Sequence, residues 1–300
     1  MASYNYKLNR DEAITEALSL VGIGEAGEPV HADDIAEAAR KLNIMLKAWQ
    51  SYGIKLWKRQ TKSITLTAGK YSYTIGQKSA GTATSTSAGN LVDSTANFTT
   101  DEIAVGDTVL NTTDSTTTTV SGLTSTTTNA LTDDIFTSGE AYEITDADVS
   151  LPRPLSIVEC SRKDSSNNEV TMNPLSKQEY EDLPNKTTQS TPINFHYDPT
   201  LNNGTFYIWP APDTTAASEY TVDIVAHIPT SDMDNSTDDI DFPNEWLEAI
   251  TYGLAYRLAP SKGLNRGERE ALRIDMQMAL DLAKGGDEEF LSVRFAPEMR

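Results

Sequence analysis

The 300-residue chain contains little of what disulfide, metal or membrane chemistry requires. Its single cysteine, Cys160, cannot form an intramolecular disulfide, which favours folding in a reducing compartment. The histidines His31, His196 and His227 are far apart and have no ligand-like spacing, so we expect no metal site. No stretch approaches the roughly twenty apolar residues that span a bilayer, and MASYNYKLNR lacks the apolar region of a signal peptide. We therefore predict neither membrane anchoring nor export by a signal peptide.

Basic residues are also scarce. The chain has 24 Lys and Arg against 44 Asp and Glu, a net charge of -20, and a pI near 4.4. Because affinity for nucleic acid comes mainly from Lys and Arg that release counterions, we do not expect tight binding to DNA. An acidic wall would instead let DNA slide past without sticking. The apolar content of 38% is enough for one large domain or two modest ones.

Motifs that carry catalysis are missing as well. There is no G-x-x-x-x-G-K-[ST] loop, no G-x-S-x-G elbow and no H-E-x-x-H helix. Gly22, Gly24 and Gly27 do spell G-x-G-x-x-G, but the residues before them have helical spacing, whereas a dinucleotide loop follows a strand. Glu25 and Glu28 also place negative charge where a phosphate would lie. We interpret this stretch as a loop between helices and predict no catalytic, cofactor-binding or metal-binding residue.

Four aromatic residues could instead form a surface for a sugar or a partner: Trp57, Tyr207, Trp209 and Trp246. Their helical or strand spacing is more typical of a core. Acidic pairs such as Asp238 and Asp239 would serve glycoside hydrolysis only if they faced each other across a cleft with one pKa raised. We interpret them as solvated charge.

Helical spacing of apolar residues occurs at both ends of the chain. Residues 1–60 predict an antiparallel pair of helices on either side of the glycine loop, and residues 241–284 predict two more. Gly253, which costs about 1 kcal/mol relative to alanine inside a helix, indicates a close helix crossing. The predicted fold class is α+β, with a four-helix bundle assembled from both chain ends. Its expected core residues are Leu18, Val21, Leu42, Trp49, Trp246, Ile250, Leu254 and Leu272.

Period-two alternation begins at residue 61. TKSITLTAGKYSYTIG predicts a β-hairpin that turns at Ala68 and Gly69, and its partner strands should lie beyond residue 150. PLSIVECSRK, NFHYDP, GTFYIWPAP and EYTVDIVAHIP predict further strands, and PLSKQEYEDLP predicts a short helix or turn. Residues 61–78 and 150–230 are therefore expected to form an antiparallel β-domain of about five or six strands.

The segment 79–149 has neither Lys nor Arg but has eleven acidic residues, which is over half of the net charge. Its abundant Thr and Ser are compatible with a disordered linker. However, apolar residues recur regularly and alternate in VGDTVLNT, TTTTVSGL and EAYEIT, with glycines between the alternating runs. We favour an inserted small all-β barrel or sandwich over disorder, and we call this segment the acidic module.

The last segment, residues 285–300, begins with Gly285 and Gly286, where we expect the final helix to end. It contains four large apolar residues, Phe290, Leu291, Val293 and Phe295. Two interpretations stay open: an extended segment that becomes ordered on a partner, or a segment folded back on its own helices.

Four stretches in order carry a family resemblance: DEAITEALSLVGIGEAGEPVHADDIAEAARKLNIMLKAWQSYGIKLW, ITLTAGKYSYTIG, PLSKQEYEDLP with GTFYIWPAP, and FPNEWLEAITYGLAYRLAP. Together they resemble the head-to-tail adaptor proteins of short-tailed phages, also called tail accessory factors or packaged-DNA stabilisation proteins. The resemblance covers roughly residues 8 to 76 and 151 to 284. The acidic module, with LVDSTANF, VGDTVLNTTD and SGEAYEI, looks like a β-module of other phage structural proteins and departs from the plain adaptor pattern.

The resemblance implies a structural virion protein, assembled in the host cytoplasm and located at the portal vertex. Such proteins form a homo-oligomeric ring, usually a dodecamer, beneath the portal protein, with the tail nozzle protein on the other side. DNA would pass through the ring without sequence-specific binding. By the same resemblance Phe290, Leu291, Val293 and Phe295 would dock between portal subunits. The acidic module would hold a tail fibre or spike, or nozzle subunits, or would simply aid solubility.

Two other classes of protein remain open at this point. A virion-associated cell-wall hydrolase would lose its activity on substitution of one carboxylate, whereas single acidic substitutions should have little effect on an adaptor. A soluble host protein with an acidic β-domain would have no need of the apolar C-terminal segment.

Overall fold

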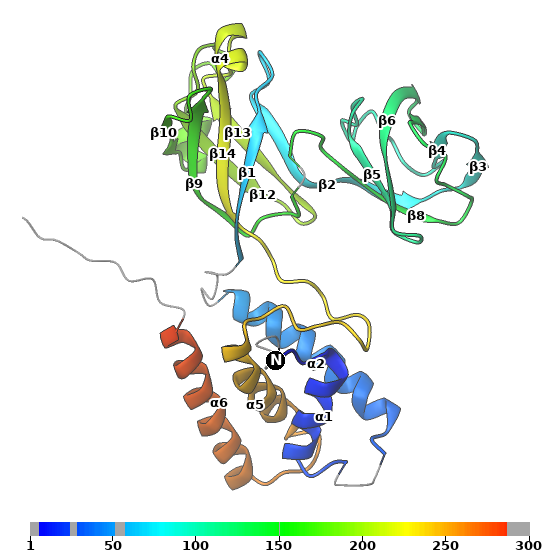
Figure 1. Ribbon diagram of the computed structural model, residues 1–300, viewed down its shortest axis with the longest axis vertical. Coiled ribbons are helices and arrows are strands. Elements are labelled where there is room, and N and C mark those ends of the chain that lie inside the picture. Colours follow the sequence, from blue (N-terminus) through cyan, green and yellow to red (C-terminus); the bar gives the residue numbers. More distant parts are fainter. Residues whose placement is uncertain (1–5, 25–28, 52–57, 150, 287–300) are drawn as a thin grey trace, which may run out of the picture. The chain divides into compact units, whose positions relative to one another are not determined.

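Two compact units divide the chain: Met1–Trp57 with Thr230–Arg300, and Lys58–Pro229. The computed structural model describes residues 6–24, 29–51, 58–149 and 151–286, without the side chains of residues 51 and 286 (Figure 1). The first unit is helical and the second is mostly β-sheet, so the predicted α+β class is confirmed.

The helical unit draws its elements from both ends of the chain. They are α1 (Arg10–Leu20), α2 (Ala32–Ser51), the 3-10 turn η2 (Asn244–Trp246), α5 (Leu247–Leu258) and α6 (Arg266–Gly286). A capping box starts α1: the Asn9 side chain accepts from the Glu12 backbone N–H at 2.8 Å, and the Glu12 carboxylate accepts from the Asn9 N–H at 3.0 Å. At the other end, α6 runs to Gly286, in agreement with the helix end predicted at Gly285 and Gly286.

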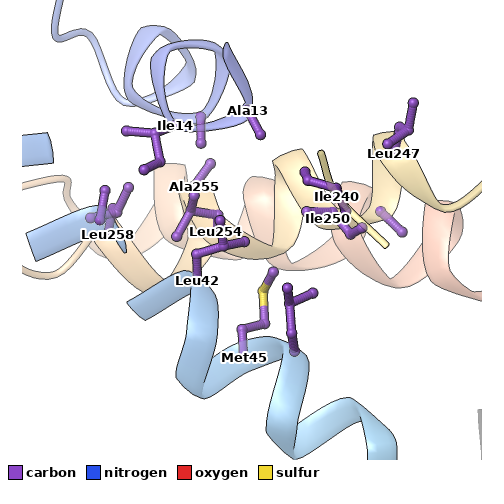
Figure 2. Close-up of a cluster of buried hydrophobic side chains, with 14 of the residues drawn as sticks. Ala13, Ile14, Leu42, Met45, Ile240, Leu247, Ile250, Leu254, Ala255 and Leu258 are labelled. Carbon is purple, nitrogen blue, oxygen red and sulfur yellow. The ribbon is translucent and has the colours of Figure 1, made fainter. Parts of the chain in front are cut away.

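Helix α5 lies at the centre of this unit and packs against α1, α2 and α6. In Figure 2, Ile14 of α1 and Leu42 of α2 approach the α5 residues Leu254 and Ala255 from opposite sides. A regular four-helix bundle of side-by-side helices is therefore not evident. One buried cluster nevertheless joins both chain ends, and it contains Leu18, Val21, Leu42, Trp49, Trp246, Ile250, Leu254 and Leu272.

Gly253 marks the closest approach of α5 to α2. A Cβ atom at this position would lie 2.9 Å from Met45 Sδ and 3.0 Å from Trp49 Cζ2, closer than side chains normally pack. The sequence predicted a close helix crossing at Gly253, and the structure has one there. A residue without a side chain lets the two helices come this near.

Acidification is expected to destabilise the helical unit through Glu37 of α2. Hydrogen bonds from Lys41, Ser261 and Lys262 lower the pKa of the Glu37 carboxyl from 4.5 to about 2. Because the folded-state pKa lies below the unfolded one, the stabilisation is complete above pH 4.5 and is lost as the pH falls towards 2. Urea unfolding of the wild type and of Glu37→Gln at several pH values would measure this contribution. If the free energy of unfolding of Glu37→Gln fell with pH as steeply as that of the wild type, Glu37 would make no such contribution.

The unit Lys58–Pro229 contains two sheets that enclose a second core. The first has the order β1-β14-β9-β10 and the second the order β11-β12-β13-β2-β8-β5-β6-β7-β4-β3. The first sheet consists of β1 (Arg59–Thr65), β14 (Tyr220–His227), β9 (Ser156–Asp164) and β10 (Glu169–Thr171). Short helices α3 (Lys177–Glu181) and α4 (Thr214–Glu219) lie between strands of this unit.

The predicted hairpin between residues 61 and 76 is wrong. The chain does turn at Gly69, where Lys70 N–H donates to the Thr67 carbonyl, but β1 and β2 (Ser72–Thr82) then enter different sheets. β1 pairs with β14, and β2 pairs with β13 (Asn203–Trp209), so the partners do lie beyond residue 150. The two strands face each other across the core through Ile64 and Tyr73, among other residues. One pairing is also parallel: β11 (Asn173–Pro174) with β12 (Asn194–Pro199).

The acidic module is β-structure. Its strands are β3 (Ser85–Ser87), β4 (Asn90–Val92), β5 (Thr108–Asn111), β6 (Thr116–Ser125), β7 (Thr128–Leu131) and β8 (Ala141–Thr145). They continue the second sheet from β2 and curl around a core of their own that includes Phe98, Val109 and Tyr142. The barrel is not closed, because β3 forms the outer end of the strand order. Val105 and Leu123, two of its recurring apolar residues, are 65% and 54% exposed.

Candidate functional site

The glycine loop after α1 ends a helix and shows no sign of a strand before it. Gly22 and Gly24 have φ angles of 78° and 76°, and the Gly22 and Ile23 N–H groups donate to the Ser19 and Leu18 carbonyls. These bonds satisfy the free carbonyls at the helix end. A Cβ atom on Gly24 would lie 2.8 Å from Val30 Cγ2, so close packing also favours glycine there. Gly27 lies outside the described residues.

The three histidines occupy separate places. His31 begins α2, where its carbonyl accepts from the Asp34 N–H at 3.0 Å. His196 is buried on β12 with Nδ1 3.0 Å from the Leu175 carbonyl oxygen, and His227 is on β14 with Nδ1 3.2 Å from Ser156 Oγ. Within the described ranges, no group of three or more His, Cys, Asp or Glu side chains could hold a metal ion. None of the described helices is both long and apolar enough to cross a membrane.

Cys160 is buried in the core of the unit Lys58–Pro229, and burial raises the pKa of its thiol. The candidate aromatic residues divide between the two units. Trp246 is 1% exposed in the helical core, so it belongs to no surface. Tyr207 and Trp209 share the half-buried face of β13, where Tyr207 packs against Tyr180 with ring centroids 4.7 Å apart and Trp209 Nε1 donates to the Asn185 carbonyl. Trp57 lies outside the described residues.

A buried ion cluster lies where the acidic module joins the rest of the unit Lys58–Pro229. Lys78 Nζ is 2.9 Å from Asp107 Oδ2 and 3.2 Å from Asp146 Oδ2, and the three side chains are only 2–6% exposed. The register of β2 against β8 shifts between Gln77 and Ser79, so Lys78 occupies a β-bulge. Bulges redirect side chains, and this one brings the last cation before the Lys- and Arg-free segment into contact with two of its carboxylates.

The charge of Lys78 is maintained in this position. Although burial lowers its pKa, the hydrogen bond to Asp107 and the attraction of Asp146 outweigh it and raise the pKa. Asp107 also accepts from the backbone N–H groups of Ala104 and Ala147 at 2.8 and 3.1 Å. The cluster therefore joins two segments of the module, residues 104–107 and 146–147, to β2.

A groove of about 480 Å³ opens beside α5 and α6 in the helical unit. Its apolar lining comes from Trp49, Tyr256, Met276 and Leu280, and two cations, Arg257 and Lys284, also line it. The docking residues predicted in the C-terminal segment, Phe290, Leu291, Val293 and Phe295, lie outside the described residues.

Residues 78–289 match the family model of the SU10 adaptor protein. This match takes in more than two thirds of the chain. The chain belongs to the SU10 adaptor protein family. No curated protein matches the chain. Membership in this family supports the resemblance to phage head-to-tail adaptors. It also supports a structural role in the virion.

The family match and the sequence resemblance agree over residues 151–284 and differ before them. The match includes the whole acidic module and leaves out the first 77 residues, which contain the resemblance over residues 8 to 76. Because the module lies within the matched range, the match gives no support to treating it as an addition to the SU10 adaptor family. The matched region also contains Lys78 and all of α5 and α6.

The sequence did not predict two features, the ion cluster at Lys78 and an exposed apolar face of α6. Lys78 could have been noticed as the last cation before a segment of 11 acids, but alternation alone does not reveal a bulge. The second feature is an exposed apolar face of α6 formed by Ile274, Met278 and Leu282. Their spacing of four was visible in the sequence, but Leu272 was the only residue of this helix that the sequence assigned to the core.

Proposed function

We propose that this adaptor forms a ring beneath the portal of a short-tailed phage, connects the portal to the tail nozzle and surrounds the DNA exit channel. The match to the SU10 adaptor protein family over residues 78–289 is the observation that carries the proposal. In this assignment the ring has twelve copies, and residues 285–300 dock on the portal through Phe290, Leu291, Val293 and Phe295.

The charge of the chain supports a channel role. A net charge of -20 repels the DNA backbone, so DNA would move past a ring of such chains without being held. Buried ion pairs offset only part of this charge in the acidic module, where the cation at Lys78 faces two of the eleven carboxylates. The module is then the part best suited to contact a basic surface on a tail fibre, spike or nozzle subunit.

Co-sedimentation with the portal ring from the same genome tests the assignment. The full chain should load the portal as a ring, and native mass should give the copy number. A version ending at Gly285 should fail to load if the C-terminal segment is the docking element. Loading by both versions would keep the adaptor assignment and overturn the docking role, whereas loading by neither would overturn the adaptor assignment.

A further inference from the structure

Helix α6 has two apolar faces, and only one of them is buried. Leu272, Ala279 and Ala283 lie in the helical core, whereas Ile274, Met278 and Leu282 are 46%, 67% and 77% exposed. The exposed three are each four residues apart, so they form one stripe along about 12 Å of the helix. We call it the α6 stripe. Large apolar side chains gathered on one face, as opposed to scattered singly, indicate an interaction surface.

Acidic residues border the α6 stripe on both sides. At 100° per residue, Asp275 and Asp281 lie about 60° to either side of Met278. Both are exposed, and Asp281 accepts a hydrogen bond from Gln277 at 2.8 Å. A partner surface should therefore have an apolar centre with cations beside it, over about two helical turns.

The same helical unit has such a surface on α2. Ile44 is 63% exposed on the face of α2 turned away from the buried residues Leu42, Met45 and Leu46. Arg40 and Lys47, also exposed, lie close to Ile44 on this face, one turn before it and one turn after it. We call these residues the α2 face.

The charges on the α2 face are partly available for a partner. Arg40 has no ion pair with any carboxylate in the described part of the chain, whereas Lys47 is 2.8 Å from Asp232 in an exposed pair. Glu37, on the same side of α2, is already engaged by Lys41 and Lys262. The distance between Arg40 and Lys47, about 10 Å along a helix, is close to that between Asp275 and Asp281.

We propose that the α6 stripe of one copy docks on the α2 face of a second copy of this chain. The proposal rests on the ring assembly proposed above and assigns its copy-to-copy contact. Two different surfaces are used, so the contact is heterologous. An open chain of copies keeps one free α6 stripe at one end and one free α2 face at the other until a ring closes. Because copies with a net charge of -20 repel one another, local opposite charges beside the apolar contact are needed to orient them.

Charge reversal with mixing tests this contact in the full chain. One variant carries Asp275→Lys and Asp281→Lys, and the other carries Arg40→Glu and Lys47→Glu. Each alone sets like charges against each other, so each should need roughly tenfold or more higher concentration to assemble than the wild type. An equal mixture should assemble again, since the lysines on α6 of one variant face the glutamates on α2 of the other, and the unchanged α6 and α2 faces meet at the alternate contacts. Sedimentation and native mass, with and without the portal ring, measure assembly.

Rescue by mixing separates a contact from a folding defect, because two misfolded chains would not restore each other. Matched unfolding midpoints of the two variants and the wild type provide the control. Assembly of either variant alone at wild-type concentrations, or no assembly of the mixture, would overturn the proposal, as would a wild type that stays monomeric both with and without the portal. If the wild type loads the portal and both variants load equally well alone, the adaptor function stands and this contact does not. If rings form and respond to mixing but never bind the portal, the contact stands and the portal assignment fails.

Discussion

Replacing Lys78 with methionine is expected to destabilise the acidic module by about 3–5 kcal/mol, the range found when one partner of a buried ion pair is removed. Methionine has a similar length and fits an apolar site, so the lost packing is small. The cost comes from Asp107 and Asp146, whose side chains are 2% and 4% exposed. Asp107 would lose its ion pair, and Asp146 would keep only Lys70, whose Nζ is 3.7 Å from Asp146 Oδ2. Water cannot easily replace the ammonium group at such a depth.

Hydrogen exchange of the full chain, followed segment by segment, measures this effect. Residues 79–149 should lose protection in Lys78→Met, whereas α1, α2, α5 and α6 should keep theirs. Lys177→Met provides the matched control, because Lys177 bridges Asp198 at 2.9 Å but is 67% exposed. Exposed pairs contribute about 0–1 kcal/mol, so this control should stay near the wild type.

A second substitution distinguishes lost charge pairing from lost shape. Adding Asp146→Asn to Lys78→Met removes one of the two stranded charges and should recover part of the stability. The double-mutant cycle should then show a coupling free energy between Lys78 and Asp146. Equal protection of the module in the wild type and Lys78→Met would show that the cluster contributes nothing, and additive effects would show that the cost is not electrostatic.

Local periodicity predicted most elements of the fold. The close crossing at Gly253 and the alternation in EAYEIT each have a short-range physical cause, and each corresponds to an observed feature. The β-structure of the acidic module could be predicted for the same reason, despite its Thr and Ser content.

Features that depend on long-range pairing could not be predicted in this way. The alternation in TKSITLTAGKYSYTIG identifies two strands, but it contains no information on which sheet each joins, and β1 and β2 separate after the turn at Gly69. The position of α5 between α1 and α2 is also set by the tertiary core and not by the helix pattern. Similarly, the exposure of Met278 becomes visible only once the buried face of α6 is known.

Replacing Leu254 with alanine is expected to destabilise the helical unit by about 2–5 kcal/mol, the range for buried leucines. Leu254 is fully buried on α5, in the cluster that joins both chain ends. Leu201→Ala is the matched control, because this leucine is 89% exposed and surface substitutions usually change stability by less than about 0.5 kcal/mol. Urea unfolding of the full-length variants compares the two.

The location of the lost protection matters as much as its size. Since Ile14 of α1 and Leu42 of α2 approach α5 from opposite sides, a cavity at Leu254 should weaken α1 and α2 together with α5 (Figure 2). Hydrogen exchange should therefore rise at both ends of the chain and stay unchanged in the strands of Lys58–Pro229. If protection fell only in α5 and α6, the N-terminal helices would be stable without the C-terminal ones. The two ends would then not be one cooperative unit, and α5 would not be the element that holds the helical unit together.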